Sequence, residues 1–409
     1  MTAQPEAIAT EVPKFGPLAG VTVVYSAIEI AAPTAAALMA EWGANVIWLE
    51  NTRVGDSMRD TAWIKEVERR NQRSVAINPF KPGGREAFLK LIEQADIFIE
   101  SSKGPVYAAR GLTDELLWEH KPDLVICHVS GYGHTGEEKM VNRAAYDRTV
   151  QAYMGYLAQN GLPEQPMAPG PYGADYFTAM MVASSSLAAL HKAKATGEGE
   201  SIDCAMYEAM LRIGAYYMVD YFNEGIEYDR PGPRNQNLCA IGEYACADGF
   251  VSIICYGAPQ NEFLLRTIGL GHLWGTEDYP EGSTALWKHG PQAALIEEKL
   301  EAFLLTKTAA EVDELFSPQA IAVGIINEVR DLEGLEHFQL RENIIEWETN
   351  EGKPVKGINI FPKFARNPGK IWRPMPKLGQ DTEAVLTAAG VTKEQIAELV
   401  EAGLIRLAD

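Results

Sequence analysis

Short apolar runs and amphipathic stretches alternate along the first third of the chain. The apolar runs have the length of strands and occupy residues 21–27, 45–50, 73–78, 96–101 and 123–133. Between them, residues 31–44, 84–95 and 111–122 carry apolar positions at helical spacing, and Thr113 is a candidate N-cap. This alternation predicts a doubly wound α/β fold with a largely parallel sheet, in which ligands bind at the carboxyl ends of the strands.

The rest of the chain predicts a second domain behind a linker. The expected elements are a helix from Asp175 to about Lys194, a strand and helix over 201–223, a hairpin over 239–257, mixed helices and strands to about Val329, and strand-like and amphipathic segments over 343–364 and 381–405. Residues 224–237 are rich in Pro, Gly, Asn and charge, which is typical of a linker.

The composition is that of a folded protein with a strong negative charge. Of 409 residues, 46% are hydrophobic and 22% are charged, and the formal net charge is −20. This charge disfavours nucleic acid and anionic membrane surfaces as main partners. The first residues lack a signal-peptide pattern and no run of about 18 uncharged apolar residues occurs, so we expect a cytoplasmic protein.

Cysteine and histidine spacings give no metal motif. The five cysteines form no CxxC pair, and the seven histidines show neither HExxH nor HxH spacing. We therefore expect buried free thiols and no metal.

Residues 21–50 imitate a dinucleotide-binding unit, because a strand, a helix and a second strand end in the acidic Glu50. The turn after the first strand reads SAIEIAAP and lacks the GxGxxG glycines that let the backbone approach a pyrophosphate. A dehydrogenase is therefore a weak alternative. A different nucleotide ligand, held by other loops, stays open.

The segment PYGADYFTAM places Asp175 where a glycine-bearing turn enters a helix. One interpretation is structural: the carboxylate caps the helix, and the positive end of the helix dipole holds it ionised. The other is catalytic, because an ionised carboxylate can act as a nucleophile while backbone N–H groups of the turn stabilise an oxyanion. The two interpretations are compatible.

Six segments carry a family resemblance. They are GPLAGVTVVYSAIEIAAPTAAALMAEWGANVIWLENTRVGDSMR, RRNQRSVAIN, GREAFLKLIEQADIFIESSKGPVYAARGL, the Asp175 segment, KATGEGESIDCAMYEAML and PKFARNPGKIWRPMPKLGQDTEAVL. Together they resemble the class III CoA-transferase family, also called the formyl-CoA transferase family. The resemblance implies a Rossmann-like large domain formed by both chain ends (residues 1–225 and 333–409), a smaller inserted α+β domain (residues 226–332) and an interlocked homodimer.

The same resemblance implies the chemistry and its residues. The candidates are Asp175 as the nucleophile, Lys103 and Arg110 as CoA-binding residues, Arg70, Asn71 and Arg73 as weaker contacts of the adenosine end, and Tyr146, Tyr172 and Tyr176 as a cage for a quaternary ammonium group. Acyl-CoA and small carboxylic acids are the implied substrates, and no cofactor is bound permanently. Formyl-CoA transferases have an arginine after the glutamate that ends the second strand. Here Asn51 stands there, and Arg53 is the candidate replacement.

Two alternatives share the fold or the ligand. An α-methylacyl-CoA racemase would use a histidine and an aspartate as proton carriers, but Tyr146 occupies the position of that histidine, and a tyrosine is a poor base near neutral pH. His134 is the remaining candidate base for that reaction. A non-catalytic CoA-binding subunit would have no need of a carboxylate at position 175, which this chain has.

Overall fold

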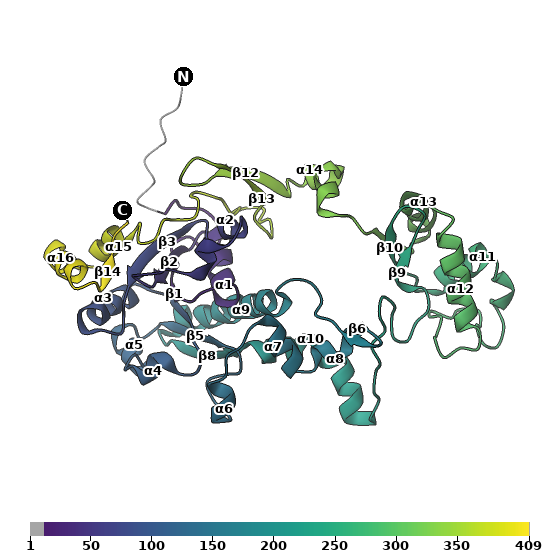
Figure 1. The fold of residues 1–409 in the computed structure, drawn as a ribbon, viewed down its shortest axis with the longest axis horizontal. Coiled ribbons are helices and arrows are strands. Elements are labelled where there is room, and N and C mark those ends of the chain that lie inside the picture. Colours follow the sequence, from purple (N-terminus) through teal and green to yellow (C-terminus); the bar gives the residue numbers. More distant parts are fainter. Residues whose placement is uncertain (1–11, 409) are drawn as a thin grey trace, which may run out of the picture. The chain divides into compact units, whose positions relative to one another are not determined.

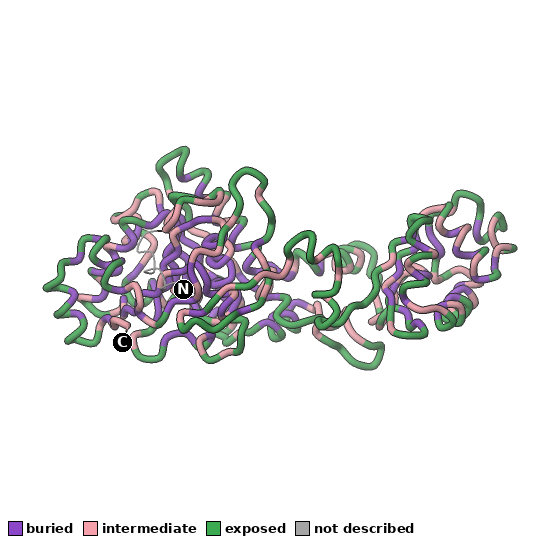
Figure 2. The backbone as a smooth tube through the Cα atoms, turned by 90° about the horizontal axis from the view of Figure 1, so that it is seen from above, coloured by how far each residue is buried: buried purple, intermediate pink, exposed green. Residues whose placement is uncertain are grey.

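The computed structural model describes residues 12–408, and by internal contacts the chain divides into two units. The first comprises the described residues of Met1–Met154, Gly170–Ala215 and Gln339–Asp409, and the second comprises Gly155–Pro169 and Tyr216–Phe338. Figure 2 shows that each unit has its own buried interior beneath exposed loops. The functional residues expected from the sequence all lie in the first unit.

The second unit includes residues 155–169, which the sequence assigns to the large domain. Arg230 accounts for this placement, because its guanidinium donates to the carbonyl oxygens of Leu162 at 2.9 Å and Pro163 at 2.6 Å. The side chain thereby ties the short segment to the chain that follows α10 (Met206–Glu224).

A seven-stranded sheet in the order β14-β3-β2-β1-β4-β5-β8 organises the described part of the first unit. Its strands are β1 (Thr22–Ser26), β2 (Asn45–Glu50), β3 (Gln72–Ile77), β4 (Ile97–Ser101), β5 (Val125–Ser130), β8 (Glu200–Ala205) and β14 (Ile405–Arg406). Only β14 runs antiparallel to its neighbour. Nearly continuous apolar sequences suit parallel strands that are covered on both faces, so the predicted α/β class with a parallel sheet is confirmed.

Helices cover both faces of this sheet (Figure 1). One face carries α1 (Ala31–Glu41) and α9 (Gly173–Thr196), and the other carries α3 (Pro82–Ile92), α5 (Asp114–His120), α15 (Thr382–Ala388) and α16 (Lys393–Glu401). The alanine-rich α1 is almost entirely buried, because it packs against both the strands and α9, and small side chains allow that close approach. Thr113 caps α5, as predicted, by accepting from the N–H of Leu116.

The remaining elements of the first unit are short. They are α2 (Ile64–Glu68), α4 (Val106–Ala109), α6 (Glu138–Val141), α7 (Asp147–Tyr153), the 3-10 turn η1 (Ser57–Asp60) and the hairpin β12 (Ile344–Glu348) with β13 (Pro354–Ile358). Two helices, α10 (Met206–Glu224) and α14 (Glu336–Leu340), begin in one unit and end in the other. Within residues 12–408, no helix combines the length and apolarity needed to span a membrane.

The second unit is built on a small antiparallel sheet in the order β11-β10-β9. Its elements are α8 (Tyr156–Gln159), β6 (Gly161–Leu162), β7 (Gln165–Pro166), β9 (Ile241–Ala245), β10 (Phe250–Ile254), α11 (Ala258–Thr267), η2 (Gly271–Leu273), α12 (Ala293–Leu304), α13 (Ala309–Phe316), η3 (Ser317–Gln319), β11 (Ala322–Ile325) and η4 (Val329–Gly334). The predicted hairpin over 239–257 is confirmed by the pairing of β9 with β10. All five cysteines of the chain are unpaired, and Cys239, Cys246 and Cys255 contribute to this unit's core.

Candidate active site

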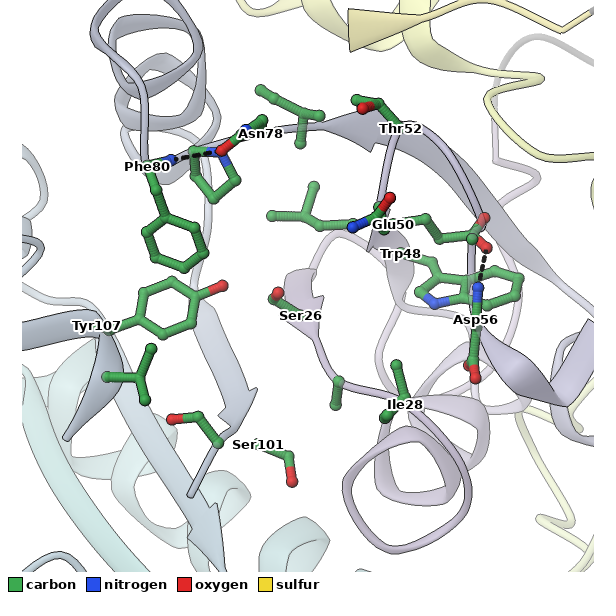
Figure 3. A pocket seen from close by; sticks show the side chains of 18 of the residues that line it. Ser26, Ile28, Trp48, Glu50, Thr52, Asp56, Asn78, Phe80, Ser101 and Tyr107 are labelled. Carbon is green, nitrogen blue, oxygen red and sulfur yellow. Dashed lines mark hydrogen bonds between the residues drawn. The ribbon is translucent and has the colours of Figure 1, made fainter. Parts of the chain in front are cut away.

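A cavity of about 440 Å³ opens at the carboxyl ends of β1 to β4 (Figure 3). Strand β1 lies between β2 and β4. The strands that follow it in sequence extend the sheet on one side through β2 to β3, and then on the other side through β4 to β5. Open α/β sheets bind ligands at such a reversal of strand order, because the loops on the two sides diverge there. The cavity therefore lies where the sequence places the ligand.

Aromatic side chains and one arginine form one wall of the cavity. The guanidinium of Arg110 lies 4.5 Å from the ring centroid of Phe80, and the ring of Tyr107 meets Phe80 edge to face at 5.1 Å. The side chain of Asn78 accepts from the N–H of Phe80 at 3.1 Å and fixes this turn. A flat wall beside a guanidinium suits a heteroaromatic ring that carries phosphate.

The acidic residues that line the cavity are neutralised by arginines. Glu50, at the end of β2, accepts from Arg59 Nε at 2.7 Å and from Nη2 at 2.5 Å, and Asp56 pairs with Arg69 at 2.8 Å. Glu50 is thus committed to Arg59 rather than open to a ribose hydroxyl. Its engagement, together with the missing glycines, removes the basis of the dinucleotide interpretation.

The two expected CoA-binding cations occupy different positions. Arg110 lines the cavity directly. Lys103 is exposed on the loop that follows β4, next to the lining residue Ser102, and no ion pair engages it among the described residues. Arg53 is exposed, and its backbone N–H donates to the side-chain oxygen of Asn51 at 2.8 Å. Of the two predicted cations, the structure thus places Arg110 in the cavity wall and Lys103 on the exposed loop beside it.

Arg70 and Asn71 have structural partners instead. Arg70 is 1% exposed, pairs with Glu41 at 2.6 Å and donates to the carbonyl oxygen of Ile358 at 2.9 Å. Asn71 is fully buried, and its side chain accepts from the N–H of Trp372 at 2.8 Å. These contacts join the N-terminal strands to the C-terminal segment, and they leave neither side chain free to bind adenosine.

Arg73 lies at the other end of its strand. It is near the start of β3 and lines a separate cavity with Lys14 and Asn45, at the amino ends of the strands. Asn78, by contrast, follows the carboxyl end of β3 and lines the main cavity. The structure therefore does not bring Arg73 together with Arg110.

Asp175 is the third residue of α9, but it does not cap the helix. The N-cap is Tyr172, in the left-handed region at φ 56°, and the cap acceptor is the carboxylate of Asp147 at the start of α7. Asp147 Oδ1 accepts from the N–H of Ala174 at 2.6 Å and from that of Asp175 at 3.3 Å. The expectation that Asp175 is itself the cap is wrong, and these two N–H groups are not available as oxyanion donors.

The carboxylate of Asp175 is consequently left without a hydrogen-bond donor among the described residues, and it is half-buried. Burial, followed by the negative charges of Asp147 and Glu29, raises the pKa of Asp175 to about 7. The sequence predicts a carboxylate that the helix start holds ionised. The raised pKa of Asp175 corrects that expectation. A pKa matched to neutral pH at a carboxylate without partners is a mark of a reactive group.

The charges around Asp175 predict the pH dependence of kcat/KM, and the substitution Asp147→Asn should shift it. Asp147→Asn keeps an oxygen that can cap α9 but removes the negative charge with the larger effect, so the pKa of Asp175 should fall. We expect the rise of kcat/KM with pH, centred near the pKa of about 7 in the wild type, to move to lower pH in Asp147→Asn and less far in Glu29→Gln. Asp123→Asn, whose carboxylate pairs with Lys121, is the control. An unmoved profile in Asp147→Asn would contradict this electrostatic coupling.

The three tyrosines expected around the substrate lie on both sides of Asp175. Tyr146 and Tyr172 are 72% and 53% exposed, at the starts of α7 and α9. Tyr176 follows Asp175, and its hydroxyl donates to Glu68 at 3.0 Å. Within residues 12–408 no ring contact joins the three, so their role as a cage stays a prediction.

His134, the candidate base of the racemase alternative, lies at another place on the sheet. Its ring is 4.9 Å from that of His128, and its Nε2 is 3.7 Å from Glu100. Among the described residues, the charges that raise the pKa of Asp175 are those of Asp147 and Glu29, and His134 is not among the causes. Sequence reasoning did not identify these two carboxylates as neighbours of Asp175. The position of Asp147 directly after Tyr146, which stands where the racemases have a histidine, could have drawn attention to it.

Comparison with known proteins shows the family and the fold of the chain. The chain belongs to CoA-transferase family III, whose family model matches residues 18–382. A crystal structure of a CaiB/BaiF family protein from Brucella suis shares 26% sequence identity with it at a TM-score of 0.75, covering 92% of this chain and 100% of that one. The orthorhombic form of Rv3272 from Mycobacterium tuberculosis has the same fold at 21% identity and a TM-score of 0.77, covering 90% and 99%.

Proposed function

We propose that this protein is a CoA-transferase that exchanges CoA between carboxylic acids through Asp175, and that its acids are L-carnitine and crotonobetaine or γ-butyrobetaine. The observation that carries the reaction type is the half-buried carboxylate of Asp175, without hydrogen-bond donors among the described residues and with a pKa of about 7. The choice of acids rests on the resemblance of the sequence to L-carnitine CoA-transferase. Family membership supports the enzyme class.

Each step of the exchange balances without ATP. An oxygen of Asp175 attacks the acyl carbon of the donor thioester, the C–S bond breaks, and CoA leaves as a thiolate. The thiolate attacks the carbonyl carbon of Asp175 in the mixed anhydride, the anhydride C–O bond breaks, and the first acid departs as a carboxylate. The carboxylate of the second acid then runs both steps in reverse. No net proton is consumed.

The charges around Asp175 favour the covalent states. Asp147 and Glu29 repel the ionised carboxylate, and acylation of Asp175 removes the charge that they repel. The same two carboxylates disfavour a free thiolate at the site, which promotes its return to the anhydride. A carboxylate of near-neutral pKa is also a stronger nucleophile than one of ordinary pKa.

CoA itself is proposed to occupy the cavity at the ends of β1 to β4. Phe80 and Tyr107 offer the aromatic wall, while Arg110 and the exposed Lys103 supply positive charge to phosphates. For a substrate with a trimethylammonium group, the faces of Tyr146, Tyr172 and Tyr176 are the proposed contacts. Neither Arg70 nor Asn71 is part of this proposed site.

We also propose a cytoplasmic, interlocked homodimer. Large aromatic side chains in the second half of α10 are exposed on the single chain, among them Tyr216 at 74% and Phe222 at 78%. Apolar surface of this kind is usually buried in an assembly. The proposed layout of a large domain from both chain ends and a smaller inserted domain provides the crossing segments that interlocking needs.

Mass spectrometry tests the proposed reaction. The protein is mixed with crotonobetainyl-CoA and L-carnitine in the absence of ATP, and we expect L-carnitinyl-CoA and free crotonobetaine in equal amounts. Failure with these acids but transfer to another carboxylic acid would refute the substrate pair and retain the reaction. Deuterium incorporation at the α-carbon of a branched acyl-CoA, with no transfer to any acid, would instead favour the racemase alternative.

A further inference from the structure

A polar cluster on one face of the main sheet stands apart from the proposed reaction. Glu100 on β4 is paired in register with His128 on β5, so the two side chains lie on the same face. His134, from the turn after β5, places its ring 4.9 Å from that of His128. One ligand atom from each of the three residues lies within 4.8 Å of the others.

Two atoms of this cluster are buried without hydrogen-bond partners. The side chain of Glu100 is 0% exposed, and only its Oε1 is engaged, 2.7 Å from His128 Nδ1. Its Oε2 has no partner, and neither has Nε2 of His134, which lies 3.7 Å from Glu100 Oε1. A buried carboxylate oxygen and a buried imidazole nitrogen without partners are both costly, and a cation between them would satisfy both.

The surroundings hold the imidazole of His128 in the orientation of a metal ligand. His128 Nε2 lies 3.0 Å from Asp114 Oδ1, and the other oxygen of Asp114 accepts from the hydroxyl of Ser201 at 2.6 Å. This directs Nδ1 of His128 toward Glu100. Histidines that bind metals commonly donate their second nitrogen to a carboxylate, which fixes the tautomer and the ring.

We propose that Glu100, His128 and His134 bind a divalent transition-metal ion of the Zn²⁺ class. Two imidazole nitrogens and one carboxylate oxygen form a donor set that suits this class, with a fourth position left for water. The ion would tie the turn after β5 to β4. None of the three residues lines the cavity proposed for CoA. The site departs from the expectation of no metal, because its ligands are too widely spaced in sequence to form a motif.

A proton competes with the metal at His128. Desolvation lowers the pKa of His128, but its hydrogen bonds to Asp114 and Glu100 outweigh this and raise it to about 9. The alternative state of the cluster is therefore a protonated imidazole between two carboxylates. Metal binding is best measured at mildly alkaline pH.

The test is a titration of the full-length, EDTA-treated protein with Co²⁺, followed by calorimetry and visible absorption and then by displacement with Zn²⁺. We expect one ion per chain, with the d–d bands of a site of low coordination number, and about 10- to 100-fold weaker binding in His134→Gln and Asp114→Asn. His120→Gln is the matched control, because His120 contacts Glu93 at 3.0 Å in an exposed pair. It should bind as the wild type does.

Two results would overturn the proposal. One is a wild-type protein that is folded by circular dichroism and takes up no ion in a saturable manner. The other is an affinity that does not change in either ligand-shell variant. Because the wild-type titration is decisive by itself, a folding defect in a variant leaves the test intact.

Discussion

Asp175→Asn should abolish CoA transfer, with kcat reduced by at least about 10⁴-fold, the scale on which removal of a catalytic nucleophile acts. An amide cannot form the anhydride, and nothing else among the groups around α9 offers a carboxylate in the same position. Asp147 is committed to capping the helix through the N–H groups of Ala174 and Asp175. Mass spectrometry of the product, and of the protein for a covalent adduct, measures the loss. CoA affinity should not change.

A stability measurement separates lost chemistry from lost folding. The unfolded chain releases the Asp175 proton near its ordinary pKa of about 3.9, whereas the folded chain keeps it to about 7. The native state therefore binds more protons between these values, and its stability falls as pH rises through that window. Asp175→Asn lacks this penalty and should be more stable than the wild type near pH 8, by on the order of 2 kcal/mol after allowance for partial exposure. The gain should vanish near pH 4. A stable variant that still transfers CoA would refute the nucleophile.

Arg110→Ala should impair substrate binding without affecting stability, and Arg70→Ala should impair stability without affecting substrate binding. Arg110 lines the cavity, so its loss should raise the KM for acyl-CoA by about 10- to 100-fold, the effect of one charge-assisted contact to phosphate, at unchanged stability. Arg70→Ala should lower the free energy of unfolding by about 3 kcal/mol at unchanged KM, because it leaves Glu41 buried without its partner. The loss stays at the lower end of the range for broken buried pairs, since burial has raised the pKa of Glu41 to about 7 and it can take up a proton.

Denaturant unfolding and steady-state kinetics on the same preparations measure both effects. Lys103→Ala should behave as Arg110→Ala does, with a smaller rise in KM, because Lys103 is exposed and does not line the cavity. Arg366→Ala removes an exposed arginine and should change neither quantity. A raised KM with unchanged stability in Arg70→Ala would return Arg70 to the adenosine site and contradict the structural role.

Much of the fold could be predicted, because local patterns report it. Buried parallel strands require continuous apolar runs, and those runs located β1 to β5 and the α/β class. The Asp-Gly turn located the hairpin of β9 and β10. The pairing of β14 with β3 could not be read in this way, since a two-residue strand has no pattern of its own and forms only against an existing edge.

The site residues show the same difference between local patterns, which the sequence reveals, and tertiary contacts, which it does not. The sequence predicted that Asp175 lies at a helix start and that the cation Arg110 follows a strand end. The structural partners of Arg70 and Asn71 could not be predicted, because a charged sequence motif does not reveal that they are Glu41 and the distant C-terminal segment. Whether an arginine meets a ligand or a buried carboxylate depends on tertiary contacts, here with Glu41, 29 positions away, and with Ile358, 288 positions away.

What the sequence determined by itself about this protein is its class of fold, its family and the residue types that its chemistry requires, since these follow from local periodicity and from contiguous motifs. Only the tertiary structure decided that Asp147, not Asp175, caps α9, and that burial with Asp147 and Glu29 raises the pKa of Asp175 to about 7. The physical reason is that a pKa depends on burial and on charges within a few ångströms, and the chain brings those charges together only by folding.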